Sequence, residues 1–515
     1  MIKHLYLLVA GLSFSIAQSQ EITSALRYSM DTPTGTARFR AMSGAFGALG
    51  GDLSSLNSNP AGSAVFNNNQ LGFSFSNFDT KNNSNYFGNS TTKKNSSFDL
   101  NQAGAVFIFN NHNPNNDWSK IALAINYEKT ANFDNSIFSA GINTNPTNNN
   151  IGDYFLSYAN ANLSRNQAGI PLSSIRNYDY FQLNYADQQA FLGYEGYLIN
   201  PVSDDDNNTV YTSNVPAGGN YYHENTIKSE GYNGKLSFNA ATSYKDQLYL
   251  GLSLNSHFTD FRQNTIFYEE NDNANNNIVD LVNTTFENEI YTYGSGFSFQ
   301  LGAIAKLNDE VRIGLAYESP TWNKLNDELR QGISSYIYDY SEDSNPSPTI
   351  VTPDTNGAVI YETYKLKTPG KITGSLAYVF NKKGLISLDY SFKDYSNIEY
   401  STEYDSRNDF INSDISNQLT GASEVRLGGE YKIERLSLRA GYRFEGSPYK
   451  NKNTVGDLNG YSLGLGYNFG GTKADISYAY AKRNSQQGFF SQGFTDGASI
   501  NSINNTVSLS LLFEL

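Results

Sequence analysis

Apolar and polar residues alternate along many segments of the chain. The clearest run is 248–255, where leucines alternate with small or polar residues, and the same pattern recurs at 386–393, 436–445, 461–469 and 507–515. Because successive side chains of a strand point to opposite faces, a period of two gives each strand one apolar and one polar face. The pattern predicts an all-β protein.

The connections between the predicted strands indicate which β architecture this is, since a soluble sandwich would also show a period of two. Links after even-numbered strands are as short as Asp246 or Asn308, whereas those after odd-numbered strands are long and Asn-rich, such as 80–99, 263–287 and the largest, 131–225. Short turns at one end, long loops at the other and an even strand count are the plan of an outer-membrane barrel. We therefore predict a transmembrane antiparallel β-barrel of about 14 strands over 67–515, with both termini periplasmic and the long loops extracellular. The predicted strands are 71–79, 100–110, 119–130, 226–245, 247–262, 287–306, 309–319, 360–381, 384–400, 423–434, 436–446, 459–469, 471–484 and 504–515.

Charged residues occupy the polar face of these strands, as Arg312, Asp389 and Glu430 illustrate. In hydrocarbon every backbone N–H and C=O needs an internal partner, so strands can cross only as a closed sheet. Charges are costly toward lipid but stable in a wet lumen. The apolar face therefore faces lipid, and the charged face lines the interior.

Composition excludes several classes of protein function. The chain has 515 residues, no cysteine, 36 basic and 50 acidic residues, and a net charge of −14; its mean hydropathy is −0.49. No apolar run is long enough for a bundle of spanning helices, and an acidic protein lacks the basic face that nucleic acids require. The absence of cysteine excludes thiolate catalysis, disulfides and thiolate metal sites. We expect no cofactor.

The first residues predict export. Lys3 and His4 precede an apolar run from Leu5 to Ala17, and small residues follow it. This is the pattern of a secretory signal peptide over 1–19, cut between Ser19 and Gln20. It places the mature protein outside the cytoplasm, and with the barrel it predicts the outer membrane of a Gram-negative bacterium.

Two segments do not read as strands. Residues 20–66 lack alternation, and 131–225 includes Leu172–Leu198, whose aromatic spacing permits a helix. The second segment is interpreted as an extracellular cap or a ligand-gathering loop, and a long solvated surface loop is an equally good interpretation.

The first segment is crowded with small residues between Arg38 and Asp52 and continues into Asn59-Pro60-Ala61-Gly62. Pro60 fixes its own φ and biases Asn59 toward extended backbone, while Gly62 permits a positive φ. Small side chains allow such a segment to pack closely inside a lumen. By physics alone the motif could also be any tight turn.

An exported chain with this Gly/Ala-rich segment and Asn59, Pro60, Ala61 and Gly62 just before the first strand resembles the FadL/OmpP1/TodX outer-membrane transporters. The resemblance implies an N-terminal hatch, 20–66, that plugs a fourteen-stranded barrel. It also implies uptake of long-chain fatty acids or other hydrophobic molecules by diffusion, with the motif shaping the hatch. Family members release substrate sideways at a kinked third strand, but 119–130 has neither Gly nor Pro to kink it, and no fatty-acid-binding residue can be matched.

Several side chains are candidates for ligand contact. Arg426, Arg439 and Arg443 could present guanidinium groups to a fatty-acid carboxylate; the alternative is that they pair with carboxylates to hold the lumen together. Phe46 in the Gly/Ala-rich segment is an apolar candidate. The carboxylates in question are Glu430, Glu434 and Glu445, and the aromatic residues proposed for the outer entry are Tyr178, Phe181, Phe191 and Tyr194.

We find no pattern that predicts catalysis or a metal site. The Gly-x-Ser-x-Gly sequence at 460–464 lies inside an alternating strand rather than at a strand–turn–helix elbow, and 204–208 lacks the glycine and glutamate of a calcium loop. His112, His223 and His257 are far apart in sequence, which places them near turns or the outer rim. We predict a non-enzymatic monomer that binds hydrophobic small molecules and membrane lipids. The alternatives are a barrel that carries exported proteins, or a haem receptor.

Overall fold

A computed structural model of the protein describes residues 22–113, 115–161, 168–273, 279–340, 345–380, 383–402 and 408–515. The predicted signal peptide, 1–19, lies outside these residues.

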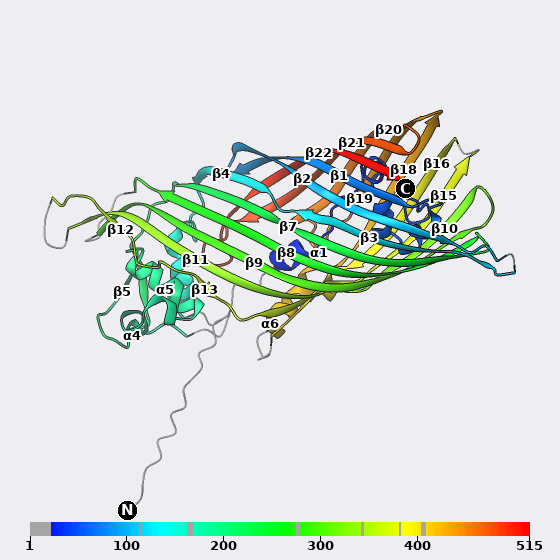
Figure 1. The fold of residues 1–515 in the computed structure, drawn as a ribbon. Helices are drawn as coiled ribbons and strands as arrows, with labels where there is room; N and C mark the ends of the chain where they lie inside the picture. Colours follow the sequence, from blue (N-terminus) through cyan, green and yellow to red (C-terminus); the bar gives the residue numbers. More distant parts are fainter. Residues whose placement is uncertain are drawn as a thin grey trace, which may run out of the picture.

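The described residues form an all-β barrel of fourteen antiparallel strands that closes by pairing the first strand with the last (Figure 1). This confirms the predicted fold class. Four of the fourteen strands are interrupted and run as β3 with β4, β10 with β11, β14 with β15, and β16 with β17. The strands are β1 (Gln70–Tyr86), β2 (Asn89–Asn110), β3 (Trp118–Asn132), β4 (Asn135–Asn143), β7 (Tyr221–Tyr244), β8 (Leu248–Glu270), β9 (Val279–Lys306), β10 (Val311–Glu318), β11 (Trp322–Asp339), β12 (Thr349–Val351), β13 (Val359–Ile360), β14 (Tyr364–Lys367), β15 (Lys371–Phe380), β16 (Gly384–Asp394), β17 (Glu399–Ser401), β18 (Gly421–Ile433), β19 (Leu436–Glu445), β20 (Val455–Asn468), β21 (Thr472–Gly488) and β22 (Gly497–Glu514).

The two faces of the barrel wall are divided as the alternation predicts. Leu315 and Leu465 point outward and are 63% and 50% exposed, whereas Ser462 and Asp475 point inward and are 3% and 4% exposed. The prediction of an irregular loop at 80–99 was wrong, because β1 and β2 continue as one hairpin to the turn Phe87-Gly88, where both residues have positive φ.

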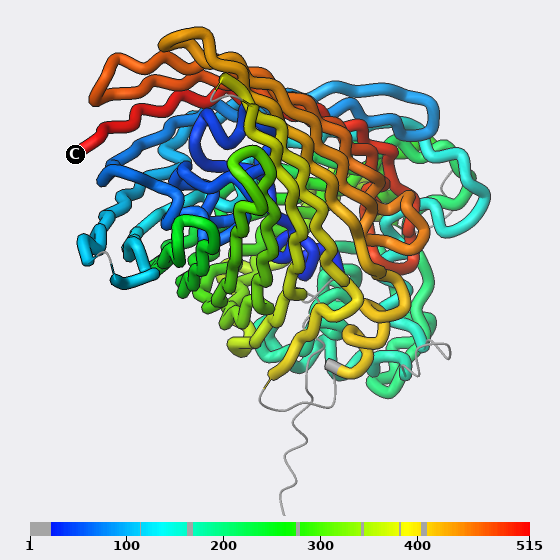
Figure 2. Tube along the Cα trace, turned by 90° about the vertical axis from the view of Figure 1, so that its right-hand side faces the viewer, coloured from blue at the N-terminus to red at the C-terminus, as the bar shows by residue number. Residues whose placement is uncertain are grey.

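The N-terminal segment lies inside the ring of strands, where it forms the hatch (Figure 2). Thr36 caps the second helix by accepting a hydrogen bond from the Phe39 N–H. Most hatch side chains are buried, which an isolated segment of this length could not achieve. Its elements are α1 (Ile22–Ser29), α2 (Ala37–Ala41) and the 3₁₀ turns η1 (Leu53–Asn57) and η2 (Pro60–Val65).

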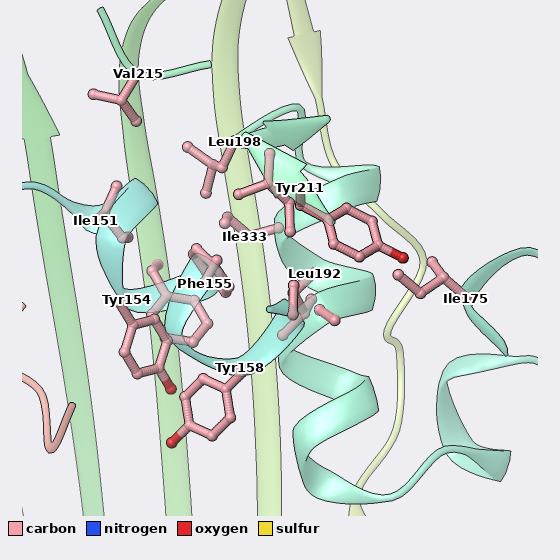
Figure 3. Close-up of a cluster of buried hydrophobic side chains, with 14 of the residues drawn as sticks. Ile151, Tyr154, Phe155, Tyr158, Ile175, Leu192, Leu198, Tyr211, Val215 and Ile333 are labelled. Atoms are coloured by element: carbon pink, nitrogen blue, oxygen red, sulfur yellow. The ribbon is translucent and has the colours of Figure 1, made fainter. Parts of the chain in front are cut away.

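A second helical unit, the cap, packs against the inner face of the strand extensions at the long-loop end. Ile151, Phe155 and Leu192 form its core together with Ile333 of β11 (Figure 3). Asn150 begins the first helix with a capping box to Asp153. The helix that the aromatic spacing permits in 172–198 is present, and the buried core rules out a fully solvated loop. The cap comprises α3 (Ile151–Ala159), α4 (Leu172–Arg176), η4 (Tyr180–Gln182), α5 (Tyr185–Glu195), β5 (Ile199–Pro201) and β6 (Tyr211–Ser213).

Two further elements lie between β16 and β18, namely η5 (Tyr395–Asn397) and α6 (Asn408–Gln418). Ile415 of α6 and Leu26 of α1 belong to one buried cluster, so α6 connects the wall to the hatch. None of the helices in the described part of the chain is long and apolar enough to cross a membrane.

Candidate functional site

The hatch is held to the barrel wall by polar contacts along its length. The carboxylate of Asp389 accepts hydrogen bonds from the Phe46 N–H at 3.0 Å and the Gly47 N–H at 2.9 Å. Ser462 Oγ donates to the Ala41 carbonyl at 3.0 Å and accepts from the Ser43 N–H at 3.1 Å. The serine of the Gly-x-Ser-x-Gly sequence therefore faces the hatch from within β20.

The Asn-Pro-Ala-Gly motif forms the last turn of the hatch. Asn59 caps η2 by accepting from the Ala61 N–H at 3.1 Å, and its Nδ2 donates to the Gly47 carbonyl at 2.8 Å and to Ala303 of the wall at 3.0 Å. Gly62 does not use the positive φ that a glycine permits. It is required for close packing instead, because a Cβ there would lie 2.6 Å from Ser55 Oγ.

Glycines on the wall make room for this motif. A Cβ on Gly251 of β8 would lie 2.4 Å from the Ala61 nitrogen, and one on Gly302 of β9 would lie 2.0 Å from Asn59 Oδ1. The motif can therefore approach the wall this closely because these two wall residues have no side chain.

The three predicted ligand-binding arginines all form ion pairs. Arg439 contacts Glu430 at 2.6 Å and Asp475 at 2.5 Å. Arg443 contacts Glu424 and Glu445, both at 2.6 Å, and Glu424 also binds Arg426, at 2.7 Å. The alternative interpretation, pairing within the lumen, holds for Glu430 and Glu445.

The structure corrects that pairing scheme in two respects. Glu434 lies exposed in the turn after β18 and forms no ion pair with any described residue. Glu424 and Asp475 are partners that we did not name, although both share the inward parity of their strands. A ligand role for the three arginines stays a prediction.

The third strand is interrupted, although the predicted strand 119–130 has neither Gly nor Pro to kink it. Its register against β7 shifts between Lys129 and Ala131. Toward the long-loop end, its pairing with β2 stops at the pair Gln102 and Glu128. The chain then resumes as β4, which packs on the inner side of β1 through a 2.6 Å bond between Ser84 and Ser139.

The glycine that permits this interruption is on the neighbouring strand. Gly231 of β7 has φ +113, and a Cβ there would lie 2.2 Å from the Asp260 carbonyl oxygen. Its carbonyl accepts from the Phe133 N–H at 2.9 Å, and its N–H donates to Asp134 Oδ1 at 3.2 Å. A search for Gly or Pro within the third strand itself therefore missed the signal.

Two cavities lie beside this interruption. The outer cavity, about 720 Å³, lies between α1, the cap and the wall; its apolar lining includes Phe133, Phe261, Phe267, Phe489 and Phe490. The inner cavity, about 280 Å³, lies between the hatch and β1, β20, β21 and β22. The two cavities adjoin, because both are lined by Thr80, Asn132, Asp134, Ser502 and Asn504.

Of the three histidines, His112 lies in the turn between β2 and β3, as predicted, and the other two occupy strands. His223 is fully buried beneath the cap, where it contacts Tyr86 at 2.8 Å and Glu269 at 2.9 Å. His257 lies half-buried in the lumen and contacts Ser298 at 2.8 Å. A haem receptor needs an accessible axial ligand, and neither of these two side chains supports that alternative.

The outer aromatic candidates divide into two pairs. Tyr178 and Phe181 are 55% and 47% exposed on the cap surface, whereas Phe191 and Tyr194 pack against the core of the cap. A role of the exposed pair in ligand entry stays a prediction.

Comparisons with known proteins agree with this architecture. The family model described as "Outer membrane protein transport protein (OMPP1/FadL/TodX)" matches residues 204–508, while no curated protein matches the sequence. A FadL homologue from Pseudomonas aeruginosa shares the fold with a TM-score of 0.53 and 13% identity over 94% of this chain and 99% of that one. The toluene transporter TodX of Pseudomonas putida does so with a TM-score of 0.51 and 12% identity, again over 94% and 99%. The family model covers more than half of the sequence, and the chain therefore belongs to the OMPP1/FadL/TodX family of outer membrane transport proteins.

Proposed function

We propose that this barrel takes up hydrophobic small molecules, long-chain fatty acids among them, by diffusion and without catalysis. The observation that carries the proposal is the pair of adjoining cavities beside the interrupted pairing of β2 with β3. In this scheme the long-loop end is extracellular, the short turns and both termini are periplasmic, and the barrel acts as a monomer among membrane lipids.

The outer cavity supplies the driving force for entry. Moving a methylene group from water to an apolar environment is favourable by about 0.8 kcal/mol, and the phenylalanines of the outer cavity provide that environment. Because the inner cavity adjoins it, a chain-like molecule can extend from one cavity into the other without returning to water.

The interrupted third strand offers the exit. Between Asn89 and Gln102, toward the long-loop end, the backbone of β2 pairs with β1 and with no other described strand. Side chains connect this part of β2 to the third strand. Lys129 forms an ion pair with Asp99, and Asn132 Nδ2 donates to Ser97 Oγ at 2.9 Å. On the outer surface at this level Phe98 is 71% exposed. Side-chain contacts can separate at a lower cost than a paired backbone ladder, so we assign release into the membrane to this point.

A disulfide across the interruption tests this route. The double variant Ser97→Cys/Asn132→Cys introduces the only thiols of a cysteine-free chain, at side chains already in contact. We expect the oxidised protein, reconstituted in liposomes, to lose uptake of radiolabelled hexadecanoate and hexadecanol, and the reduced protein to recover it.

The matched control is Ser76→Cys/Ser508→Cys, which joins β1 to β22 where backbone pairing is continuous and the two hydroxyls are 2.6 Å apart. Its oxidation should leave uptake unchanged. Equal uptake by the oxidised and reduced forms of the first variant would refute lateral exit. Liposomes with the wild-type barrel that take up neither compound would refute the transport proposal.

A further inference from the structure

Three lysines lie in one row on the outer surface of four neighbouring strands, β2, β1, β22 and β21 (Figure 1). Lys94 of β2 is directly opposite Lys81 of β1. On the other side of Lys81, Ile503 of β22 separates it from Lys482 of β21. Because neighbouring strands are about 4.8 Å apart, the row spans about 14 Å. Lys94 and Lys482 are exposed, and Lys81 is half-buried.

The row has no ion-pair partner among the described residues. Elsewhere on the wall, Lys473 of the same β21 binds Glu514 at 2.5 Å. Like charges directly opposite each other in a sheet repel, as Lys81 and Lys94 do. In a chain with a net charge of −14, a row of cations left without carboxylates favours an anion that comes from outside the protein.

The two carboxylates closest to the row in register have other partners. Asp79, two residues before Lys81, accepts from the Asn77 side chain at 2.8 Å. Asp457 of β20 accepts from the Ser447 N–H at 2.8 Å. The next positions toward the long-loop end are all neutral, and they are Thr92, Asn83, Asn501 and Asn484. The row therefore keeps its positive charge.

The row lies beyond the edge of the lipid-facing apolar surface. On the same face, Phe98, Tyr478 and Val507 are 71%, 44% and 43% exposed. Each is four residues from the row on its strand, which is about 13 Å along the strand. Aromatic side chains mark the level of the lipid head groups in membrane barrels, and lysine side chains extend along such surfaces toward that level. The lysines are therefore within reach of head groups, while acyl chains cover the apolar surface beneath them.

We propose that this face binds a membrane lipid with a phosphorylated head group, in the leaflet at the long-loop end, with Lys81, Lys94 and Lys482 as the residues that contact phosphate. An ammonium group binds phosphate as a compact point charge. A free phosphate gains nothing from the apolar surface beneath the row, whereas the acyl chains of a lipid do. The inference rests on the membrane orientation given with the proposed function, and it does not depend on transport.

Two lipids that differ only in phosphate test this site. The full chain in micelles of a non-ionic detergent is titrated with diphosphoryl lipid A and with lipid A from which both phosphates have been removed, and bound lipid is counted by native mass spectrometry. A lysine near a membrane surface contributes about fivefold to the binding of an anionic lipid. We expect the triple variant Lys81→Gln/Lys94→Gln/Lys482→Gln to bind the phosphorylated lipid about 100-fold more weakly. Its binding of the dephosphorylated lipid should equal that of the wild type.

Two further variants serve as controls. Lys93→Gln/Lys450→Gln/Lys452→Gln removes the same charge from exposed lysines outside the row and should bind both lipids as the wild type does. Replacing the three lysines of the row by arginine should retain the preference for phosphate. The glutamine variant of the row relieves the repulsion between Lys81 and Lys94, so its melting temperature without lipid should not fall.

Equal binding of the two lipids by the wild type would overturn the proposal, as would an equal loss of affinity in the control triple variant. Complete displacement of diphosphoryl lipid A by millimolar inorganic phosphate would reveal a site for free phosphate and would also overturn it. Transport is judged separately, by uptake of hexadecanoate into zwitterionic liposomes, which the glutamine variant of the row should retain. A wild type that prefers the phosphorylated lipid but takes up no hexadecanoate would reject the transport function and support the lipid site.

Discussion

The ion pairs of Glu430 offer a selective way to weaken the attachment of the hatch to the barrel wall. Its carboxylate is 1% exposed and accepts from Arg38 of the hatch at 2.9 Å and from Arg439 of the wall at 2.6 Å. In Glu430→Gln the side chain keeps its size and loses its charge. Arg439 retains Asp475, whereas Arg38 loses its ion pair to the wall and keeps the Gly51 carbonyl of its own hatch, at 3.0 Å.

The magnitude follows from the two ion pairs. Opposite charges about 4 Å apart attract by about 4 kcal/mol at an effective dielectric constant of 20. Breaking a buried pair by removing one partner typically costs about 3–5 kcal/mol. We expect Glu430→Gln to lower the free energy of unfolding by about 3–5 kcal/mol. Most of this loss should come from weaker attachment of the hatch to the wall.

Two measurements check this expectation. Urea unfolding in lipid vesicles reports the free energy, and the conductance of single barrels in a planar bilayer reports whether the hatch still blocks the lumen. Glu434→Gln is the control, since Glu434 is exposed in the turn after the same strand. A loss below about 1 kcal/mol, with conductance equal to that of the control, would refute the reasoning that this charge holds the hatch.

Two further predictions concern the lipid face and acid. Leu465→Arg should cost about 2–4 kcal/mol in vesicle unfolding if Leu465 lies at the bilayer midplane, whereas Ser477→Ala on the inward face should cost under about 0.5 kcal/mol; equal losses would mean that the faces are assigned wrongly. Burial alone would raise the pKa of Asp31 in the hatch, but Lys393 and Lys371 outweigh it and hold that pKa below its usual range. A depressed pKa gives stability that is present above the unfolded value of about 4 and lost as pH falls further. The conductance should therefore rise in strong acid, and Asp31→Asn should reduce that acid step without abolishing it, because Glu430 also loses its ion pair to the hatch there.

Alternation along single strands predicted which face of the barrel each residue occupies, because that information is local. Leu465 and Gly464 were assigned correctly to lipid and lumen on this basis. What a lumen residue touches depends on where the hatch lies, which no strand pattern encodes. Substitution of Gly464 by Ser would therefore be expected from the sequence to be mild, yet a Cβ there would lie 2.4 Å from the Ala41 Cβ.

The partners of the lumen charges were only partly predictable for the same reason. Parity places Glu424, Arg426 and Arg443 inside, but the stagger between strands decides which of them meet. The interruption of the third strand depends on Gly231, a residue of a different strand that is about 100 positions later in the chain.

The seam between β1 and β22 links sealing of the cylinder to placement of the N-terminal segment. Ser510 bonds to Ser74 across the seam at 2.7 Å and also accepts from the Ala37 N–H at 2.6 Å. Because the seam joins residues more than 400 positions apart, its closure carries a large entropic cost and is expected late in assembly. Until the seam closes, the sheet is open and the N-terminal segment can enter the future lumen from the side. Ser510 contacts both the seam and the hatch, so closure of the barrel and placement of the hatch depend on the same side chain.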